Sequence, residues 1–418
     1  MSIEVNSFID LWLKIDEIDN KPKNILLLGN TKGFFGSCSE DKNIFTNAYG
    51  DEETIKNNYF WLENEYNICN SNLYIIGDTD VCKYYHRIIS DIASMMGKKP
   101  KYKYMDINTC VKKKGISEEK EIEKYYVNIL KEQRGKRMKF DKIIMNPPYD
   151  GNLHLKILEQ AISLLKDDGN CVNLSPIRWL QDPLAEYKKN SDYHRFKDVR
   201  NRIESIKIIS AHDFQLMFDA VMNFDIGVYK IKNNIISKKI DIINPIIRKI
   251  SNFNYNNPAP LESDKYVGIR VRIPIILGGR SGGSGKRKIQ LSTLGKLYVF
   301  RDGYKDGKQW WEHYNTNQFT KRTITMGSSI EFNTEKEAEN FCKQFETTLC
   351  KFYIGFAITD VHVRNSNVLW MGDCINPRTG LKGYKSEWTD KDFYEYFGIT
   401  EQEQKEIEET MKPYMWGK

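Results

Sequence analysis

The sequence contains no run of eighteen apolar residues, so we predict no membrane span. Its first residues have neither the basic flank nor the apolar core of a secretory signal peptide, and we expect none. The eight cysteines are scattered without a Cys-x-x-Cys pair, and His86 and His154 lie apart from any metal-ligand spacing. We therefore expect reduced thiols, no metal, and a cytoplasmic location in a bacterial or virus-infected cell.

Acidic residues are scarce between residues 265 and 330, where three Asp and Glu stand against thirteen Lys and Arg. This segment is also rich in aromatic residues, and it includes a glycine-rich basic loop at 278–288. Lys and Arg that neutralise phosphates supply most of the sequence-independent affinity for nucleic acid, so the composition predicts contact with DNA. The alternative is a disordered surface loop with incidental charge. The candidate DNA-binding residues are Arg280, Lys286, Arg287 and Lys288.

Short apolar runs typical of buried strands alternate with helical patterns in the first part of the chain. The strands are predicted at 24–29, 72–80, 101–106, 140–146, 169–176, 203–209 and 225–231. Helical patterns include an amphipathic stretch at 153–165 and a later one at 334–352, which opens with a capping-box pattern. The alternation predicts an α/β fold with a mostly parallel, three-layer sheet. We assign residues 1–23 to an N-terminal helix, 24–240 to the sheet domain, and 241–418 to a second domain.

One predicted strand ends abruptly in Asn146, Pro147, Pro148 and Tyr149. In an open α/β sheet, ligands bind at the carboxyl ends of strands. The Asn146 side-chain oxygen and the Pro147 carbonyl could each accept one hydrogen of an adenine amino group, which would make its lone pair available. Tyr149 would stack on the base, which is worth roughly 1–3 kcal/mol and helps offset its extrusion from a duplex. The alternative is a turn without a function.

Acidic residues end two of the other predicted strands. Asp78 fits an acceptor for ribose hydroxyls, and Gly77 before it would let a ligand approach closely. Asp106 fits an acceptor for the exocyclic amine of a bound adenosyl group. The alternative for both acids is that they cap the helices that follow.

The motif at 140–149, the acids at 78 and 106, and the patterns at 152–155, 169–176, 334–341 and 388–398 resemble one family. They are similar to N6-adenine DNA methyltransferases related to the Eco57I and TaqI enzymes. The resemblance implies a Rossmann-like methyltransferase sheet with helices on both faces, S-adenosylmethionine as donor, and a C-terminal mixed α+β target-recognition domain. It also implies methylation of a flipped adenine at N6 in double-stranded DNA, in restriction-modification, with a restriction or recognition subunit as a further partner.

The chain departs from this family at the first donor-binding motif, which would lie at Gly29 and Gly33. The family has an acid before the glycine-rich turn, whereas this sequence has none and places Lys32 near the donor's amino group. Acids from 40–53 could substitute, donor binding could be weakened, or the chain could be a non-catalytic DNA-binding subunit. An RNA adenine methyltransferase is a further alternative. A permuted motif order using the glycine loop at 278–285 is disfavoured, because no acid precedes that loop.

Overall fold

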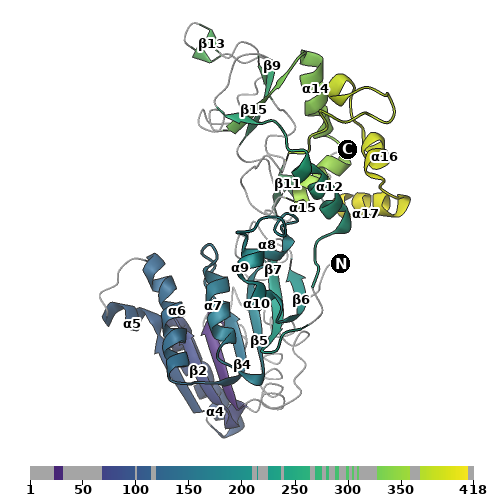
Figure 1. The fold of residues 1–418 in the computed structure, drawn as a ribbon. Helices are drawn as coiled ribbons and strands as arrows, with labels where there is room; N and C mark the ends of the chain where they lie inside the picture. The colour runs from purple at the N-terminus through teal and green to yellow at the C-terminus, as the bar shows by residue number, and fades with distance from the viewer. Residues whose placement is uncertain are drawn as a thin grey trace. The chain divides into compact units, whose positions relative to one another are not determined.

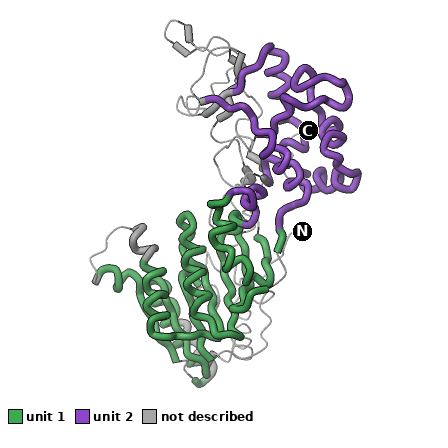
Figure 2. The backbone as a smooth tube through the Cα atoms, in the orientation of Figure 1, with its two compact units in different colours: residues 1–179, 189–220, 225–241 green, residues 180–188, 221–224, 242–418 purple. Residues whose placement is uncertain are grey.

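A computed structural model gives the structure of the protein. It describes residues 23–31, 68–98, 101–113, 119–209, 214, 225–236, 240–263, 269–274, 279–281, 288–290, 298–300, 304–305, 308–309, 327–357 and 368–412. The helix predicted at 1–23 lies outside these residues except for its last one. The chain divides into two compact units, which Figure 2 shows in different colours. Unit 1 comprises residues 1–179, 189–220 and 225–241, and unit 2 comprises residues 180–188, 221–224 and 242–418.

Unit 1 is built on a seven-stranded sheet with the strand order β3-β2-β1-β4-β5-β7-β6 (Figure 1). Its strands are β1 (Asn24–Gly29), β2 (Asn72–Gly77), β3 (Lys101–Asp106), β4 (Phe140–Asn146), β5 (Leu165–Pro176), β6 (Ile203–Ile209) and β7 (Ile226–Lys232). The first five are parallel, and β7 pairs antiparallel with both β5 and β6. The central strands are buried on both faces, as the 0% exposure of Ile25, Leu26, Leu27 and Leu28 in β1 shows.

Helices cover both faces of this sheet. They are α4 (Thr79–Met96), α5 (Ile107–Lys113), α6 (Glu119–Gly135), α7 (Leu153–Ile162), α9 (Asp192–Arg195) and α10 (Lys197–Arg200), with the 3-10 turn η2 (Ile68–Asn70). The chain moves toward one edge of the sheet through α4 and toward the other through α7. Since parallel crossovers are right-handed, these two helices lie on opposite faces. The predicted Rossmann-like sheet with helices on both faces is therefore confirmed.

Unit 2 combines a four-stranded antiparallel sheet with helices. The sheet has the order β12-β9-β15-β8. Two separate pairs of short strands, β10-β11 and β13-β14, lie between β9 and β15 in the sequence. The strands are β8 (Glu262–Ser263), β9 (Ile269–Pro274), β10 (Gly279–Ser281), β11 (Lys288–Gln290), β12 (Tyr298–Phe300), β13 (Tyr304–Lys305), β14 (Lys308–Gln309) and β15 (Gly327–Phe332). The helices are α12 (Pro245–Asn256), α14 (Glu335–Gln344), α15 (Thr348–Ala357), α16 (Asp390–Phe397), α17 (Glu401–Met411) and the turn η7 (Gly383–Lys385), while α8 (Arg178–Gln181) spans the point where unit 1 gives way to unit 2.

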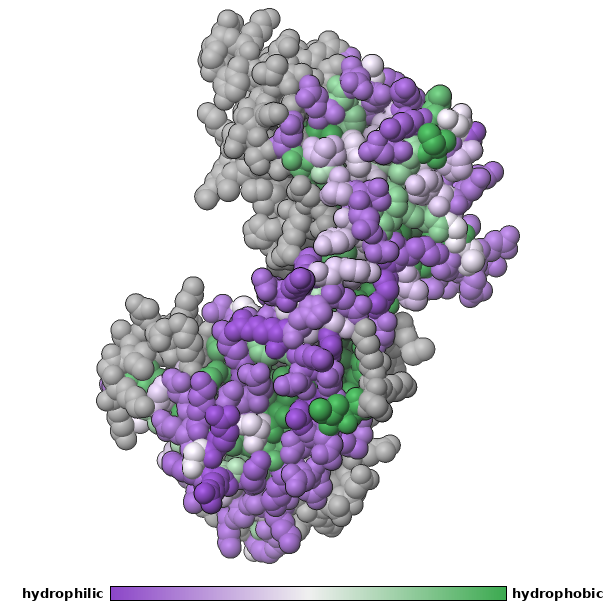
Figure 3. All heavy atoms as spheres, in the orientation of Figure 1, coloured by the Kyte–Doolittle hydropathy of each residue, from purple (hydrophilic) through white to green (hydrophobic). Residues whose placement is uncertain are grey.

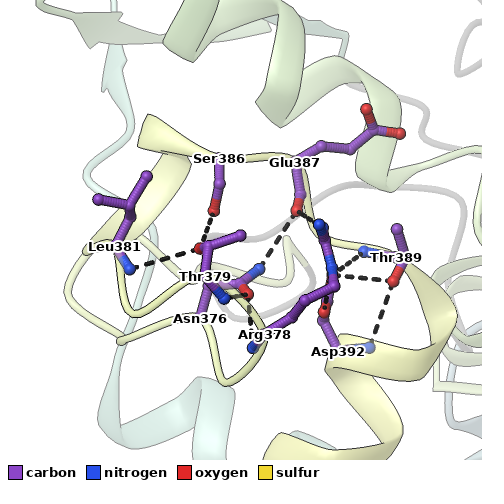
Figure 4. Close-up of polar contacts among 8 residues, drawn as sticks. All are labelled: Asn376, Arg378, Thr379, Leu381, Ser386, Glu387, Thr389 and Asp392. Carbon is purple, nitrogen blue, oxygen red and sulfur yellow. Dashed lines mark hydrogen bonds and ion pairs between the residues drawn. The ribbon is translucent and has the colours of Figure 1, made fainter.

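Polar side chains hold the loop before α16 in unit 2 (Figure 4). The Arg378 guanidinium donates to both carboxylate oxygens of Asp392, at 2.9 and 3.1 Å, and to the Glu387 carbonyl at 3.1 Å. Asp392 has an exposed fraction of 0%, and it also closes a capping box with Thr389 at the start of α16. The loop is therefore tied to the helix by a bidentate ion pair.

Two predicted helices differ from the structure. The pattern at 153–165 ends as a helix at Ile162, because Leu165 already begins β5 and the Phe140 amide donates to the Leu164 carbonyl. The pattern at 334–352 divides into α14 and α15. The division has a cause distant in sequence, since the Asp390 carboxylate accepts from the amides of Thr348 and Leu349 and so caps a new helix start.

Among the described residues, no helix is long and apolar enough to cross a membrane, and no group of three or more His, Cys, Asp or Glu could hold a metal ion. The visible face of unit 1 is mostly hydrophilic where residues are described (Figure 3). Its helices therefore bury their apolar stripes against the sheet and expose their polar ones.

Candidate active site

The register of the parallel strands brings four of the predicted site residues together at the carboxyl ends of the strands. Gly29 at the end of β1 pairs with Asn146 at the end of β4. On the other side of β1, Gly77 at the end of β2 pairs with Asp106 at the end of β3. The four residues lie at the carboxyl ends of adjacent strands, which is where open α/β sheets bind ligands.

Gly29 approaches the main chain of Asn146 so closely that no side chain fits there. Its φ is +76°, and a Cβ atom built on it would lie 2.2 Å from the Asn146 carbonyl oxygen. That distance is far below van der Waals contact, and the neighbouring atom is main chain, which cannot rotate away. At position 29, the main chain at the end of β4 thus occupies the space that any side chain, an acid included, would need.

The Asn146 side-chain amide is bonded at both ends. Its Nδ2 donates to the Asn30 carbonyl at 2.8 Å, and its Oδ1 accepts from the Tyr149 hydroxyl at 2.5 Å. The Asn30 amide in turn donates to the Asn146 carbonyl at 2.9 Å. A carbonyl can only accept, so the bond to Asn30 assigns the nitrogen of the Asn146 amide to that side and leaves the oxygen on the other.

Tyr149 is a hydrogen-bonding residue as well as an aromatic one. Its hydroxyl lies 3.1 Å from the Leu174 carbonyl, so two acceptors are in reach of its single hydrogen. Burial raises the pKa of Tyr149 far above its ordinary value, and the hydroxyl therefore stays protonated. The Pro147 carbonyl oxygen has no hydrogen-bond donor among the residues that the structure describes.

His154, a residue of α7, packs against the ring of Tyr149. The two rings meet edge to face, with centroids 6.3 Å apart and an interplanar angle of 79°. His154 is 3% exposed, and neither of its ring nitrogens has a hydrogen-bond partner within the described part of the chain. Burial, followed by the nearby charge of Arg178, lowers the pKa of His154 to about 3, so the imidazole is neutral at physiological pH.

Asp78 is the N-cap of α4, and the structure leaves part of its carboxylate available. Its Oδ1 accepts from the Val81 amide at 2.8 Å, and the side chain is exposed at the edge of the sheet. One carboxylate oxygen of Asp78 therefore caps the following helix, which was the alternative role for this residue. The other oxygen can accept a further donor, such as a hydroxyl group.

Asp106 has its acceptor positions filled by α5, the helix that follows, and by Thr79 of α4. Oδ1 accepts from the amides of Asn108 and Thr109, and Oδ2 accepts from the hydroxyls of Thr79 and Thr109, at distances between 2.9 and 3.3 Å. Partial burial would raise the pKa of Asp106, but these hydrogen bonds outweigh it and hold the pKa below its usual value. A carboxylate has about four lone-pair positions, so a further donor requires a threonine hydroxyl to turn away.

The remaining predicted residues lie partly outside the described chain. Gly33, Lys32 and the acids at 40–53 are among these undescribed residues, as are Lys286 and Arg287. Arg280 is in β10 and Lys288 is in β11, which pair antiparallel with Ser281 opposite Lys288. The two ends of the basic glycine-rich segment thus meet as a short β-ladder.

The sequence did not indicate Asn30 as part of the site. Its contribution is made by main-chain atoms, and a main-chain contact leaves no trace in the residue type. The only available signal was its place directly after Gly29, in a glycine-punctuated turn at a strand end.

Comparisons with known proteins bear on the fold only. No protein-family model matches the chain, and no curated protein matches it. Solved structures that it resembles include TrmN from Thermus thermophilus (12% identity, 51% of this chain and 44% of that chain, TM-score 0.27) and an rRNA methylase from Streptococcus thermophilus (11%, 53% and 92%, 0.26). SMU.776, solved in complex with SAH, matches at 10% identity over 56% of this chain and 51% of that chain, with a TM-score of 0.29. The chain thus spans about half the length of TrmN and SMU.776, and similarity at these TM-scores carries no argument about activity.

Proposed function

We propose that the protein transfers a methyl group from S-adenosylmethionine to the N6 amino group of an adenine flipped out of double-stranded DNA. The observation that carries the proposal is the Asn146 amide. It lies at the carboxyl end of β4, its nitrogen is anchored by the Asn30 carbonyl, and its oxygen is thereby oriented as an acceptor beside Pro147.

The chemistry follows from what two acceptors do to an aromatic amine. Adenine N6 is a poor nucleophile because its lone pair is delocalised into the ring. Oδ1 of Asn146 has a second lone pair beside the one that Tyr149 uses, and it can take one amino hydrogen. The Pro147 carbonyl can take the other, which draws the nitrogen toward a tetrahedral shape. The Pro147–Pro148 turn holds both acceptors in place before the reaction, so little entropy is lost during it.

The donor would be held at the neighbouring strand ends. When bound, S-adenosylmethionine supplies an electrophilic methyl group on a sulfonium centre. The available oxygen of Asp78 fits a ribose hydroxyl. Gly77 before it makes room for Val81 of α4 and not for a ligand, because a Cβ there would meet the Val81 side chain at 2.7 Å. Asp106 has a smaller share in this proposal than the sequence suggested, since its oxygens already have four donors.

The DNA part of the proposal rests on composition. The excess of Lys and Arg at 265–330 supports binding of a phosphate backbone, with Arg280, Lys286, Arg287 and Lys288 as contacts. The proposal extends to a restriction or recognition subunit as partner and to a cytoplasmic setting.

Replacing Asn146 tests the proposal. Asn146→Ala removes one acceptor, and we expect at least a 100-fold loss of methyl transfer from labelled donor to mixed-sequence DNA, with an unchanged circular dichroism spectrum. Asn256→Ala is the matched control, because Asn256 is exposed at the end of α12 and, in the described part of the chain, its side chain bonds within its own helix. Full activity of Asn146→Ala would contradict the proposal. Methylation of RNA in place of DNA in the same assay would identify the other nucleic acid as the substrate.

A non-catalytic, methyltransferase-like DNA-binding subunit is the second candidate. Two observations favour it, the absence of space for an acid at Gly29 and the filled acceptors of Asp106. Calorimetry with S-adenosylmethionine, with and without DNA, separates the two functions. Binding supports the enzyme, and no heat in either titration supports the subunit.

A further inference from the structure

The turn after β1 is held by a buried tyrosine from α4. The Tyr85 hydroxyl donates to the Thr31 carbonyl at 2.6 Å, and it lies 2.7 Å from the Thr31 hydroxyl. With its hydrogen given to the carbonyl, Tyr85 Oη accepts from Thr31 Oγ1. Both residues are 0% exposed, so the pair is shielded from water.

The same turn holds the Asn146 amide. Thr31 closes the turn by donating its amide to the Gly29 carbonyl at 3.0 Å. Between them, Asn30 gives its amide to the Asn146 carbonyl and takes the Asn146 side-chain hydrogen on its own carbonyl. Hydrogen bonds therefore join Tyr85 to Thr31 and Asn30 to Asn146, and the peptide bond between Asn30 and Thr31 connects the two pairs.

We propose that Tyr85 is a positioning residue for Asn146, acting through the buried Thr31 and the main chain of Asn30. Asn30 itself is exposed, and its carbonyl and amide are bonded only to Asn146 among the described residues, so the position of its carbonyl otherwise depends on the residues on either side. On one side, Gly29 has no side chain that could restrict the backbone. On the other side, Thr31 is anchored by its two hydrogen bonds to Tyr85. Without the Tyr85 hydroxyl, the peptide that carries the Asn30 carbonyl keeps only the Thr31–Gly29 bond and its bonds to Asn146, and we expect the orientation of the Asn146 amide to loosen.

This inference rests on the proposed function for its catalytic consequence but not for its structural one. Two measurements on Tyr85→Phe separate them. Hydrogen–deuterium exchange of peptides covering residues 24–31 reports the Asn30 amide bond to Asn146 whether or not the protein is an enzyme. The single-turnover rate of methyl transfer reports the effect on the reaction.

Tyr353→Phe is the matched control, since Tyr353 is also 0% exposed and hydrogen-bonded but lies in unit 2. We expect Tyr85→Phe to speed exchange at residues 24–31 by at least tenfold and to lower the single-turnover rate by at least tenfold, with little change in KM for DNA. Tyr353→Phe should lower the melting temperature without either effect. Thr31→Val, which keeps the main-chain bond to Tyr85, should show the same effects to a smaller degree and serves if Tyr85→Phe fails to fold.

Unchanged exchange at residues 24–31 in Tyr85→Phe would overturn the inference. If the wild-type protein transfers no methyl group at all, the proposed function fails, and the exchange measurement still decides the role of Tyr85. If exchange rises while the rate of an active enzyme stays the same, Tyr85 stabilises the turn without positioning Asn146, which also overturns the inference.

Discussion

The contact between Gly29 and Asn146 allows the sharpest test of the site. In Gly29→Ala, the new Cβ would lie 2.2 Å from the Asn146 carbonyl oxygen, whereas ordinary contact begins near 3.4 Å. The end of β4 must therefore move by about 1 Å. A misplacement of about 1 Å can cost on the order of 100-fold in rate, which is the loss of methyl transfer that we expect.

The stability cost of Gly29→Ala has two parts. A positive φ costs a non-glycine residue about 1–2 kcal/mol, and the forced main-chain shift adds about 1–3 kcal/mol. Gly97→Ala separates them, because Gly97 has a φ of +65° but nothing within 4 Å of its Cβ position. We expect thermal unfolding of unit 1 to shift by about 2–8 °C in Gly97→Ala and by about twice as much in Gly29→Ala.

The activity of the two variants decides the matter. Gly97→Ala should keep the wild-type rate of methyl transfer, because its strain is local to the end of α4. Equal rates and equal melting temperatures for the two variants would refute the steric account of Gly29. That result would also leave the absence of an acid at position 29 without a structural reason.

Two further predictions concern stability. The pKa of His154 is about 3 in the folded protein, below its ordinary value of 6.5, so protons bind the unfolded chain first and wild-type stability falls as pH drops from 6.5 toward 3. In His154→Leu, the free energy of unfolding should fall less steeply with decreasing pH, by up to about 1.4 kcal/mol per pH unit, as measured by chemical denaturation at each pH. The same slope for the wild type and the variant would contradict the burial of a neutral imidazole. In unit 2, Arg378→Ala removes the charged partner of the buried Asp392 and should lower the melting temperature measurably. Lys382→Ala, whose ion pair with Asp373 is exposed, should lower it by less.

The strands of unit 1 were predictable because their signals are local. The run from Asn24 to Gly29 is apolar and ends at a glycine, and β1 has these bounds. The parallel order followed from the alternation of strands and helices, and it places Asn146 and Asp106 at the same edge. Residue type and spacing were sufficient here, since burial of an apolar strand depends little on the identity of its neighbours.

The contacts inside the site were not predictable, because they join residues distant in sequence. Asn30 and Asn146 are 116 positions apart and meet through a main-chain carbonyl. The sequence left two roles open for Asp106, and the decision depended on Thr79 from another helix. The break between α14 and α15 likewise depends on Asp390, more than forty residues away.

The two hydrogen bonds between Asn30 and Asn146 have a thermodynamic consequence. They make the turn after β1 and the amide after β4 a single conformational element, so a molecule that binds at one favours particular geometries of the other. Linkage then requires reciprocity: a ligand at the turn changes the affinity of a ligand at the amide by the same factor as the reverse. Two titrations, each with the other ligand saturating, should therefore give equal ratios of dissociation constants.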